Sequence, residues 1–190
     1  MKNFLKKLFC FIIIIAFTLI VSFFLKDELN KKDLSLDENV NNAIINSKDI
    51  QLEEAYVTKI VDGDTIWVKL GNTEKKVRLI GIDCPEYTKQ IEPYGKEATE
   101  YTTEKLLNKM VFLQKDVSNT DNYDRLLRYV WTEKIYEVND ENISKYLFNY
   151  SLCNEGLAES KYYKPDIFFQ NYLDVAQKYA KDNKKGMWNN

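Results

Sequence analysis

The chain contains no histidine among its 190 residues. This absence excludes Ser-His-Asp triads, zinc sites that use imidazole ligands, and any histidine general base. The three cysteines (Cys10, Cys84 and Cys153) lie far apart without a C-x-x-C pair, so a four-thiolate zinc site is also excluded. A cysteine nucleophile would lack its usual histidine partner. Chemistry in this chain therefore falls to carboxylates, Lys, Arg, Tyr and Ser/Thr, together with a metal that prefers oxygen.

Arginine is nearly absent, since almost all of the 27 basic residues are lysine. The arginines are Arg78, Arg125 and Arg128. A guanidinium can bind a phosphate through two parallel N–H bonds, which an ammonium cannot do. Arg78 in KVRLIGI and Arg125 in TDNYDRLLRYVW are therefore candidates for phosphate binding. The alternative for each is a structural ion pair or a side chain that extends along the surface to solvent.

The run LFCFIIIIAFTLIVSFFL, residues 8–25, carries no charge and follows Lys2, Lys6 and Lys7. It predicts a hydrophobic helix that acts as a signal peptide or a signal anchor. Because the run is longer than the apolar core of an ordinary signal peptide and no A-x-A site follows, an uncleaved membrane anchor is favoured; cleavage near Ser22 and secretion is the alternative. The preceding lysines predict a cytoplasmic N-terminus and an extracytoplasmic location for the remainder.

Residues 26–52 are polar and predict a linker, which leaves residues 53–190 for the folded domain. Period-two patterns predict strands at 55–61, 65–70, 75–82, 110–115 and 126–131. Helices are predicted at 93–108, at 142–156 with Gly156 as its C-terminal cap, and at 165–186 with Asp166 as its N-cap. The aromatic residues of these helices fall at helical spacing, which indicates core packing rather than a platform for stacked bases. The expected fold is α+β: a five-stranded OB-type Greek-key barrel with three packed helices.

Carboxylates cluster where the predicted strands end: Asp64 in VDGDT, and Asp83 and Glu86 in IDCPE. A solvated turn is the ordinary explanation for such acids. Three carboxylates at loop ends can also hold a hard cation such as Ca²⁺ through oxygen ligands. Combined with Arg78 and Arg125, they suit phosphoryl hydrolysis without histidine.

Five motifs carry a family resemblance: VDGDTIWV, VRLIGIDCPE, YDRLLRYVW, NEGLA and YYKP, in that order. Over about Ala55 to Trp188 the chain resembles the staphylococcal (micrococcal) nuclease family, also called thermonuclease. The resemblance implies an OB-type barrel with calcium-dependent phosphodiesterase activity on DNA and RNA.

The resemblance also implies roles for individual residues. Asp64 and Asp83 match carboxylate ligands of one Ca²⁺ ion, and Cys84 matches a ligand that binds through its backbone carbonyl, where the family usually has threonine. The other matches are Glu86 as general base, Arg78 and Arg125 as phosphate-binding arginines, and Tyr123, Tyr162 and Tyr163 as contacts to the substrate.

The sequence departs from the family pattern in three places. Asp124 stands where glycine is common and could partly neutralise the adjacent Arg125. The loop YTKQIEPYG is shorter than in the staphylococcal enzyme. Acidic residues also slightly outnumber basic ones, whereas a polyanion-binding protein is usually basic.

The expected enzyme is a monomer that acts on DNA and RNA, with a membrane contact through residues 8–25 and no protein partner. One alternative is a catalytically inactive OB-fold module, tethered to the membrane, that binds single-stranded nucleic acid. Another is a membrane-tethered interaction protein whose acids form only a structural calcium site.

Overall fold

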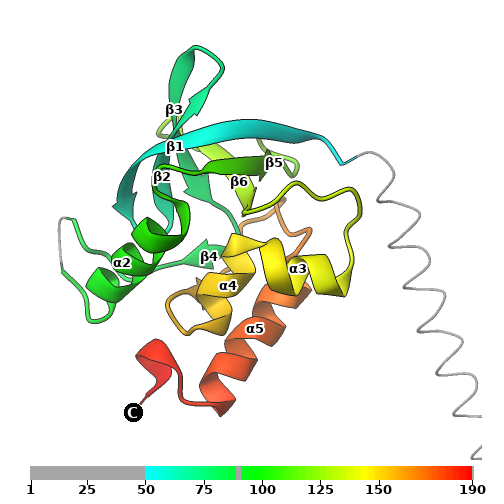
Figure 1. Cartoon of the computed structure of the whole chain (residues 1–190). Helices are drawn as coiled ribbons and strands as arrows, with labels where there is room; N and C mark the ends of the chain where they lie inside the picture. The colour runs from blue at the N-terminus through cyan, green and yellow to red at the C-terminus, as the bar shows by residue number, and fades with distance from the viewer. Residues whose placement is uncertain (1–49, 89–90, 190) are drawn as a thin grey trace, which may run out of the picture. The chain divides into compact units, whose positions relative to one another are not determined.

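Five strands close into a barrel in the structure, a computed structural model that describes residues 50–88 and 91–189 (Figure 1). The strands follow the order β1-β2-β3-β6-β5 around the barrel, and β5 pairs with β1 to close it. Every pair is antiparallel except β3–β6, which is parallel. Their bounds are β1 (Leu52–Asp62), β2 (Thr65–Leu70), β3 (Thr73–Leu79), β5 (Met110–Gln114) and β6 (Leu126–Trp131). The predicted α+β class and five-stranded barrel are confirmed.

The hairpin β2–β3 shows why these residues form strands. Ile66 and Val68 alternate with more exposed residues and are fully buried in the barrel, as the period-two pattern predicts. The strands reverse at Gly71, whose φ of 55° lies in the left-handed region that glycine adopts without strain. Two register shifts in β1 let this long strand curve and pair with both β2 and β5.

The predicted strand 75–82 ends early. β3 stops at Leu79, and Gly81 turns the chain with a φ of 79°. A side chain at this φ would be strained, and a Cβ on Gly81 would lie 2.5 Å from Leu173 Cδ1, so that Leu173 would have to shift. The chain then forms β4 (Ile82–Asp83), which pairs with β7 (Glu159–Ser160) in a separate two-stranded sheet. This turn carries Asp83 out of the barrel wall.

The described residues contain four α-helices rather than the three predicted: α2 (Gly95–Leu106), α3 (Asp140–Tyr146), α4 (Phe148–Asn154) and α5 (Gln170–Asp182), with a final 3₁₀ turn η2 (Gly186–Trp188). The helix predicted at 142–156 is interrupted at Leu147, which is extended and forms a β-bridge with Trp131 at the end of β6. Leu147 thus continues the pairing of the barrel, and this tertiary contact overrides local helix propensity.

Two predicted helix caps have different outcomes. Gly156 follows α4 with a φ of 69°, and the N–H of Leu157 donates to the carbonyl of Leu152 at 2.9 Å, which confirms the glycine cap. The N-cap assignment of Asp166 was wrong, because α5 begins only at Gln170. Asp166 is instead 2% exposed and accepts a 2.7 Å hydrogen bond from the backbone N–H of Ser118.

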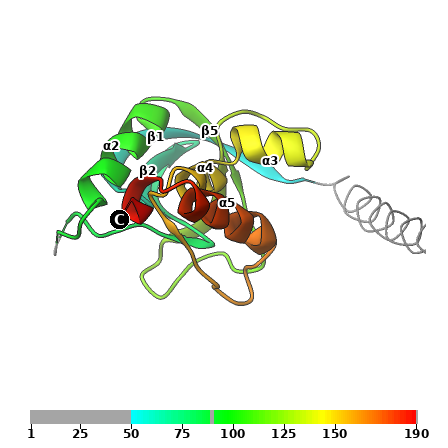
Figure 2. The same cartoon turned by 90° about the horizontal axis from the view of Figure 1, so that it is seen from below.

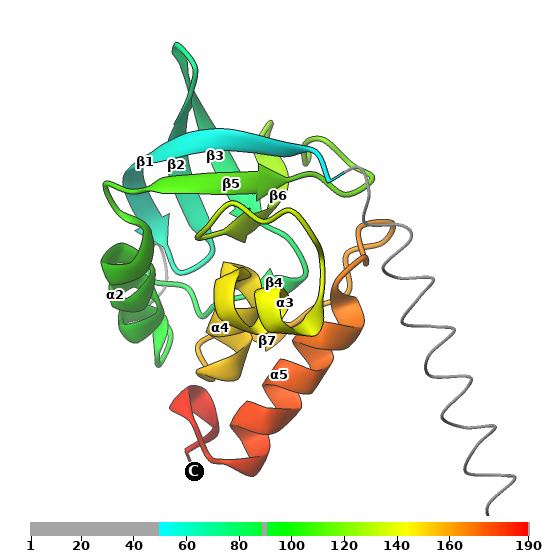
Figure 3. The same ribbon diagram turned by 45° about the vertical axis from the view of Figure 1, so that its right-hand side comes forward.

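The helices cover one end of the barrel, as the views in Figures 2 and 3 show. A cluster of buried aromatic and aliphatic residues lies between the barrel and the helices, and includes Tyr129, Trp131, Leu147 and Phe169. The Phe169 ring meets the Tyr129 and Trp131 rings edge-on at centroid distances of 4.7 and 5.6 Å. These contacts confirm core packing for the helix-spaced aromatic Phe169.

The predicted apolar helix at 8–25 and residues 26–49 of the predicted linker (26–52) lie outside the described residues. Within the part of the chain that the structure describes, no helix has the length and apolar character that a membrane crossing requires.

Candidate active site

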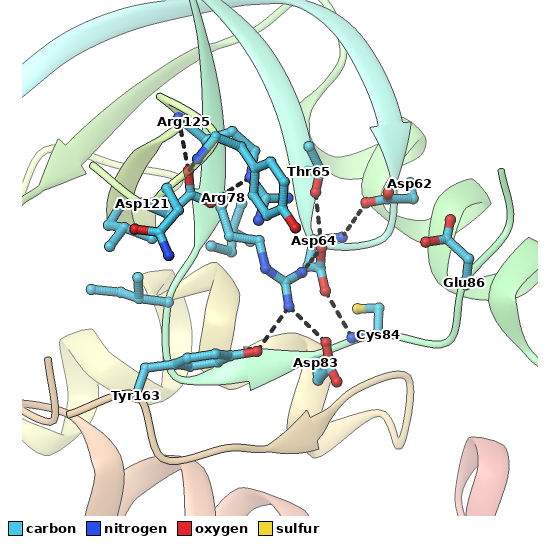
Figure 4. Close-up of a pocket in the computed structure, with 15 residues that line it drawn as sticks. Asp62, Asp64, Thr65, Arg78, Asp83, Cys84, Glu86, Asp121, Arg125 and Tyr163 are labelled. Carbon is cyan, nitrogen blue, oxygen red and sulfur yellow. Dashed lines mark hydrogen bonds and ion pairs between the residues drawn. The ribbon is translucent and has the colours of Figure 1, made fainter. Parts of the chain in front are cut away.

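A cavity of about 370 Å³ opens where β1–β2, β3, β4 and the segment before β6 meet (Figure 4). Its lining brings together residues that are far apart in the sequence. The predicted site residues among them are Asp64, Arg78, Asp83, Cys84, Glu86, Tyr123, Arg125 and Tyr163. The remaining candidate, Tyr162, does not line this cavity.

Asp64 occupies the turn between β1 and β2 and is only 4% exposed. Its carboxylate accepts a hydrogen bond from the Thr65 hydroxyl at 3.0 Å and one from the backbone N–H of Cys84 at 2.9 Å. Asp62 accepts the backbone N–H of Asp64 at 3.2 Å, and burial raises the pKa of the Asp62 carboxyl. The turn therefore fixes Asp64 and ties it to the segment that follows β4.

Arg78 lies between the two predicted carboxylate ligands. Its Nη1 forms an ion pair with Asp64, and its Nη2 lies 2.6 Å from Asp83 Oδ1 and 3.3 Å from the Tyr163 hydroxyl. Burial alone lowers the pKa of the guanidinium, but the facing Tyr163 and Asp83 oxygens outweigh that effect, and the pKa is raised. Asp64 and Asp83 thus both face the positively charged guanidinium of Arg78.

Carboxylate oxygens suit a hard cation, but in this structure the Arg78 guanidinium lies between the two carboxylates. Among residues 50–88 and 91–189, no group of three or more His, Cys, Asp or Glu side chains is placed to hold a metal. The two converging carboxylates therefore need further oxygen donors, which backbone carbonyls and water can supply. The Cys84 backbone is held beside Asp64, and burial raises the pKa of its thiol well above the ordinary value, so the sulfur is uncharged at neutral pH. Coordination by the Cys84 carbonyl stays a prediction.

Glu86 lines the cavity on a side apart from Asp64 and Asp83 (Figure 4). Its Oε1 accepts hydrogen bonds from the Thr88 hydroxyl and from the backbone N–H groups of Tyr87 and Thr88, the latter two at 3.1 and 2.9 Å. Its backbone N–H donates to Glu92 Oε2 at 2.9 Å. The carboxylate is therefore oriented by its own loop, and its role as a base stays a prediction.

Arg125 is held by Asp121, a residue that the sequence did not single out. Arg125 Nε lies 2.6 Å from Asp121 Oδ2, and Asp121 Oδ1 accepts the backbone N–H groups of Tyr123 and Arg125 at 2.9 and 3.0 Å. Asp124 has a φ of 59°, which explains why glycine suits this position. Asp121, rather than the adjacent Asp124, is the ion-pair partner found for Arg125 in the described structure.

The family model of the staphylococcal nuclease homologues matches residues 76–190. The chain belongs to the staphylococcal nuclease family. It is 39% identical over 142 residues to a thermonuclease of Staphylococcus hyicus, covering 73% of this chain and 78% of that protein. The thermonuclease of Staphylococcus intermedius is 37% identical over 145 residues, covering 75% and 80%. Endonuclease YncB of Bacillus subtilis is 28% identical over 143 residues, covering 73% and 63%.

The adjacent residues Tyr162 and Tyr163 of this nuclease-family domain lie in different surroundings. Tyr163 lines the cavity and accepts the hydrogen bond from Arg78. The Tyr162 hydroxyl donates to Asp174 on α5 at 3.3 Å, and 58% of the residue is exposed. Tyr123, on the Arg125 loop, is 82% exposed, and the Arg125 guanidinium lies 5.5 Å from its ring centroid. Substrate contact by these tyrosines stays a prediction, which geometry favours for Tyr163 and Tyr123.

Lys161 is a further residue near the site that the sequence did not single out. It follows the two-residue strand β7, and its Nζ lies 2.5 Å from Asp83 Oδ2. The only hint in the sequence is a lysine directly before YYKP. Nothing in a pattern so short predicts that β7 would pair with β4 and bring Lys161 to Asp83.

The contacts of Asp121 with Arg125 Nε and with the backbone N–H groups of Tyr123 and Arg125, here called the Asp121 clasp, lead to a prediction. Asp121→Asn keeps an oxygen that accepts the two backbone N–H groups but removes the ion pair to Arg125 Nε. Charge-assisted hydrogen bonds contribute about 1.5–3 kcal/mol, so we expect kcat to fall about tenfold or more with little change in KM. Steady-state hydrolysis of single-stranded DNA measures both constants.

Asp124→Gly is the matched control, because glycine adopts the left-handed conformation at that position and the clasp stays intact. Wild-type turnover by Asp121→Asn would contradict the positioning role.

Burial alone raises the pKa of Asp121, but hydrogen bonds from Arg125 and Tyr123 outweigh it and lower the pKa. The clasp is therefore complete above the ordinary pKa of 3.8 and is lost only as the pH falls through the lowered value.

Proposed function

We propose that this chain is a calcium-dependent nuclease that hydrolyses phosphodiester bonds of DNA and RNA in the cavity at Arg78. The observation that carries the proposal is the convergence of Asp64 and Asp83 on one cationic position, with a second arginine, Arg125, in the same cavity. The names of its relatives, thermonuclease and endonuclease, support the same reaction class.

Calcium fits the donor set better than a transition metal does. Asp64, Asp83 and the Cys84 carbonyl would hold the ion through oxygen alone, and oxygen ligands suit hard cations. When bound, the ion supplies a Lewis acid that polarises the phosphate. Mg²⁺ requires near-ideal octahedral geometry, so we expect it to support less activity.

The chain's own residues supply the rest of the mechanism. Arg78 and Arg125 bind the non-bridging phosphate oxygens and stabilise the negative charge of the five-coordinate transition state. Glu86, held by its own loop, orients or deprotonates the attacking water. Tyr163 accepts a hydrogen bond from Arg78 Nη2 and so helps to hold the guanidinium in place.

The test is incubation of the full chain with end-labelled single-stranded DNA, double-stranded DNA and RNA, with Ca²⁺, with Mg²⁺ or with chelator. Cleavage that requires Ca²⁺ supports the proposal, and full activity in chelator contradicts it. Retention of single-stranded substrate on the protein without cleavage under all conditions would favour the inactive binding module.

We also propose that residues 8–25 anchor the enzyme in the membrane with the nuclease outside. If the run forms an α-helix, it would span about 27 Å at 1.5 Å per residue, close to a hydrocarbon core of about 30 Å. We expect activity in the membrane pellet that external protease removes from intact cells. A soluble active form that begins after residue 20 would contradict the anchor and favour secretion, and protease-resistant activity would contradict the outward orientation.

A further inference from the structure

Lys161 is placed beside the predicted metal ligand Asp83 by the small β4–β7 sheet. Asp83 pairs with Glu159 in this sheet, and the backbone N–H of Lys161 donates to the carbonyl of Gly81 at 2.9 Å. Lys161 therefore lies diagonally across from Asp83 on the same face, a separation that a long side chain spans. The backbone pairing of β4 with β7, rather than a chance side-chain conformation, therefore brings Lys161 next to Asp83.

Both oxygens of Asp83 are bound by cationic side chains. Arg78 Nη2 lies 2.6 Å from Oδ1, and Lys161 Nζ lies 2.5 Å from Oδ2. The Arg78 side chain is only 11% exposed, whereas that of Lys161 is 51% exposed. An ion that reaches Asp83 from solvent thus meets the ammonium of Lys161 at the exposed edge of the carboxylate.

We propose that Lys161 competes with the metal ion for Asp83 and thereby sets the calcium affinity of the site. This inference rests on the proposed function, since it takes Asp64 and Asp83 as the metal carboxylates. Binding of the ion requires the ammonium to leave Oδ2 or to share the carboxylate with a second positive charge. In either case Lys161 weakens binding, because the affinity of an oxygen-ligand calcium site depends on the net negative charge of its ligands.

The size of the effect follows from Coulomb's law. A displaced ammonium that stays about 8 Å from a divalent ion in water opposes it by about 1 kcal/mol, which is about fivefold in the dissociation constant. Because the ammonium is half-exposed, salt screens this repulsion over a Debye length of about 10 Å at 0.1 M. The difference between variants should therefore shrink as ionic strength rises.

The experiment is isothermal titration of Ca²⁺ into the full chain in non-ionic detergent at low salt, without nucleic acid. Lys161→Met removes the charge while keeping an unbranched apolar stem, and we expect it to bind Ca²⁺ about fivefold more tightly than wild type. Lys161→Arg keeps the charge and should bind close to the wild-type affinity. Lys164→Met, in the same segment but without an ion pair in the described structure, is the matched control and should also stay close to wild type.

The possible outcomes separate the inference from the function on which it rests. If no variant binds Ca²⁺, calcium dependence itself is contradicted. If wild type binds Ca²⁺ and Lys161→Met binds equally or more weakly, the competitor role is overturned, as it is if Lys164→Met tightens binding to the same extent. Circular dichroism verifies folding, and Lys161→Gln serves as a second neutral variant to which the same criteria apply.

Discussion

Replacement of Arg78 by lysine is expected to lower kcat by a factor of about 10²–10³, which corresponds to about 2.7–4 kcal/mol of lost transition-state stabilisation. Lysine keeps the positive charge but loses the planar fork, and in this structure the two terminal nitrogens of Arg78 contact different partners, Asp64 and Asp83. Arg125→Lys should behave similarly. Initial rates on single-stranded DNA with saturating Ca²⁺ provide the measurement.

Arg128 supplies the control for this experiment. It is 3% exposed, its guanidinium binds Glu53, and it donates to the backbone carbonyls of Asn119 and Leu127 at 3.1 and 2.8 Å. The contact with Glu53 joins β6 to β1, and the Arg128 side chain does not line the cavity. Arg128→Lys should therefore lower the melting temperature and leave kcat of the folded protein unchanged. An Arg78→Lys enzyme with wild-type turnover would show that Arg78 acts only as a structural ion pair.

Phe169→Ala is expected to lower the free energy of unfolding by about 3–5 kcal/mol, a large share of the 5–15 kcal/mol typical of a domain. The Phe169 ring is fully buried and packs edge-on against Tyr129 and Trp131 of β6. Alanine would leave a cavity where the start of α5 meets the barrel. Urea denaturation followed by tryptophan fluorescence measures the change.

The neighbouring Phe168 offers a matched control, since it is the same residue type but 56% exposed. Phe168→Ala should change the unfolding free energy by about 1 kcal/mol or less. Equal losses from the two variants would contradict the packing role assigned to Phe169.

The barrel was largely predictable from sequence because its signals are local. Alternation of apolar residues such as Ile66 and Val68 marks the strands, and Gly71 marks the hairpin turn. Asp64, Asp83, Arg78 and Arg125 were found because each lies at or near the end of a predicted strand in a recognisable motif. The structure confirms that the barrel brings Asp64, Asp83 and Arg78 together, which motif order alone does not require.

Most features that the sequence did not predict depend on contacts between distant segments, whereas the Asp121–Arg125 contact joins residues four positions apart. The helix at 142–156 breaks because Leu147 pairs with Trp131, and Asp166 fails as a cap because it binds Ser118 instead. Lys161 reaches Asp83 only through a two-residue strand, and the Asp121 clasp depends on the exact path of a loop. No periodicity or propensity encodes such pairings.

The hydrogen bond from Arg78 to Tyr163 joins residues 85 positions apart, and the ion pair of Lys161 with Asp83 spans 78. Contacts this distant form slowly, because the intervening chain must lose its freedom before they become stabilising. A chain emerging from the ribosome cannot complete the cavity until β7 and the segment around Tyr163 have been synthesised. The contacts of Arg78 with Tyr163 and of Asp83 with Lys161 therefore form only after most of the chain has been synthesised and the segment around Tyr163 has folded onto the barrel.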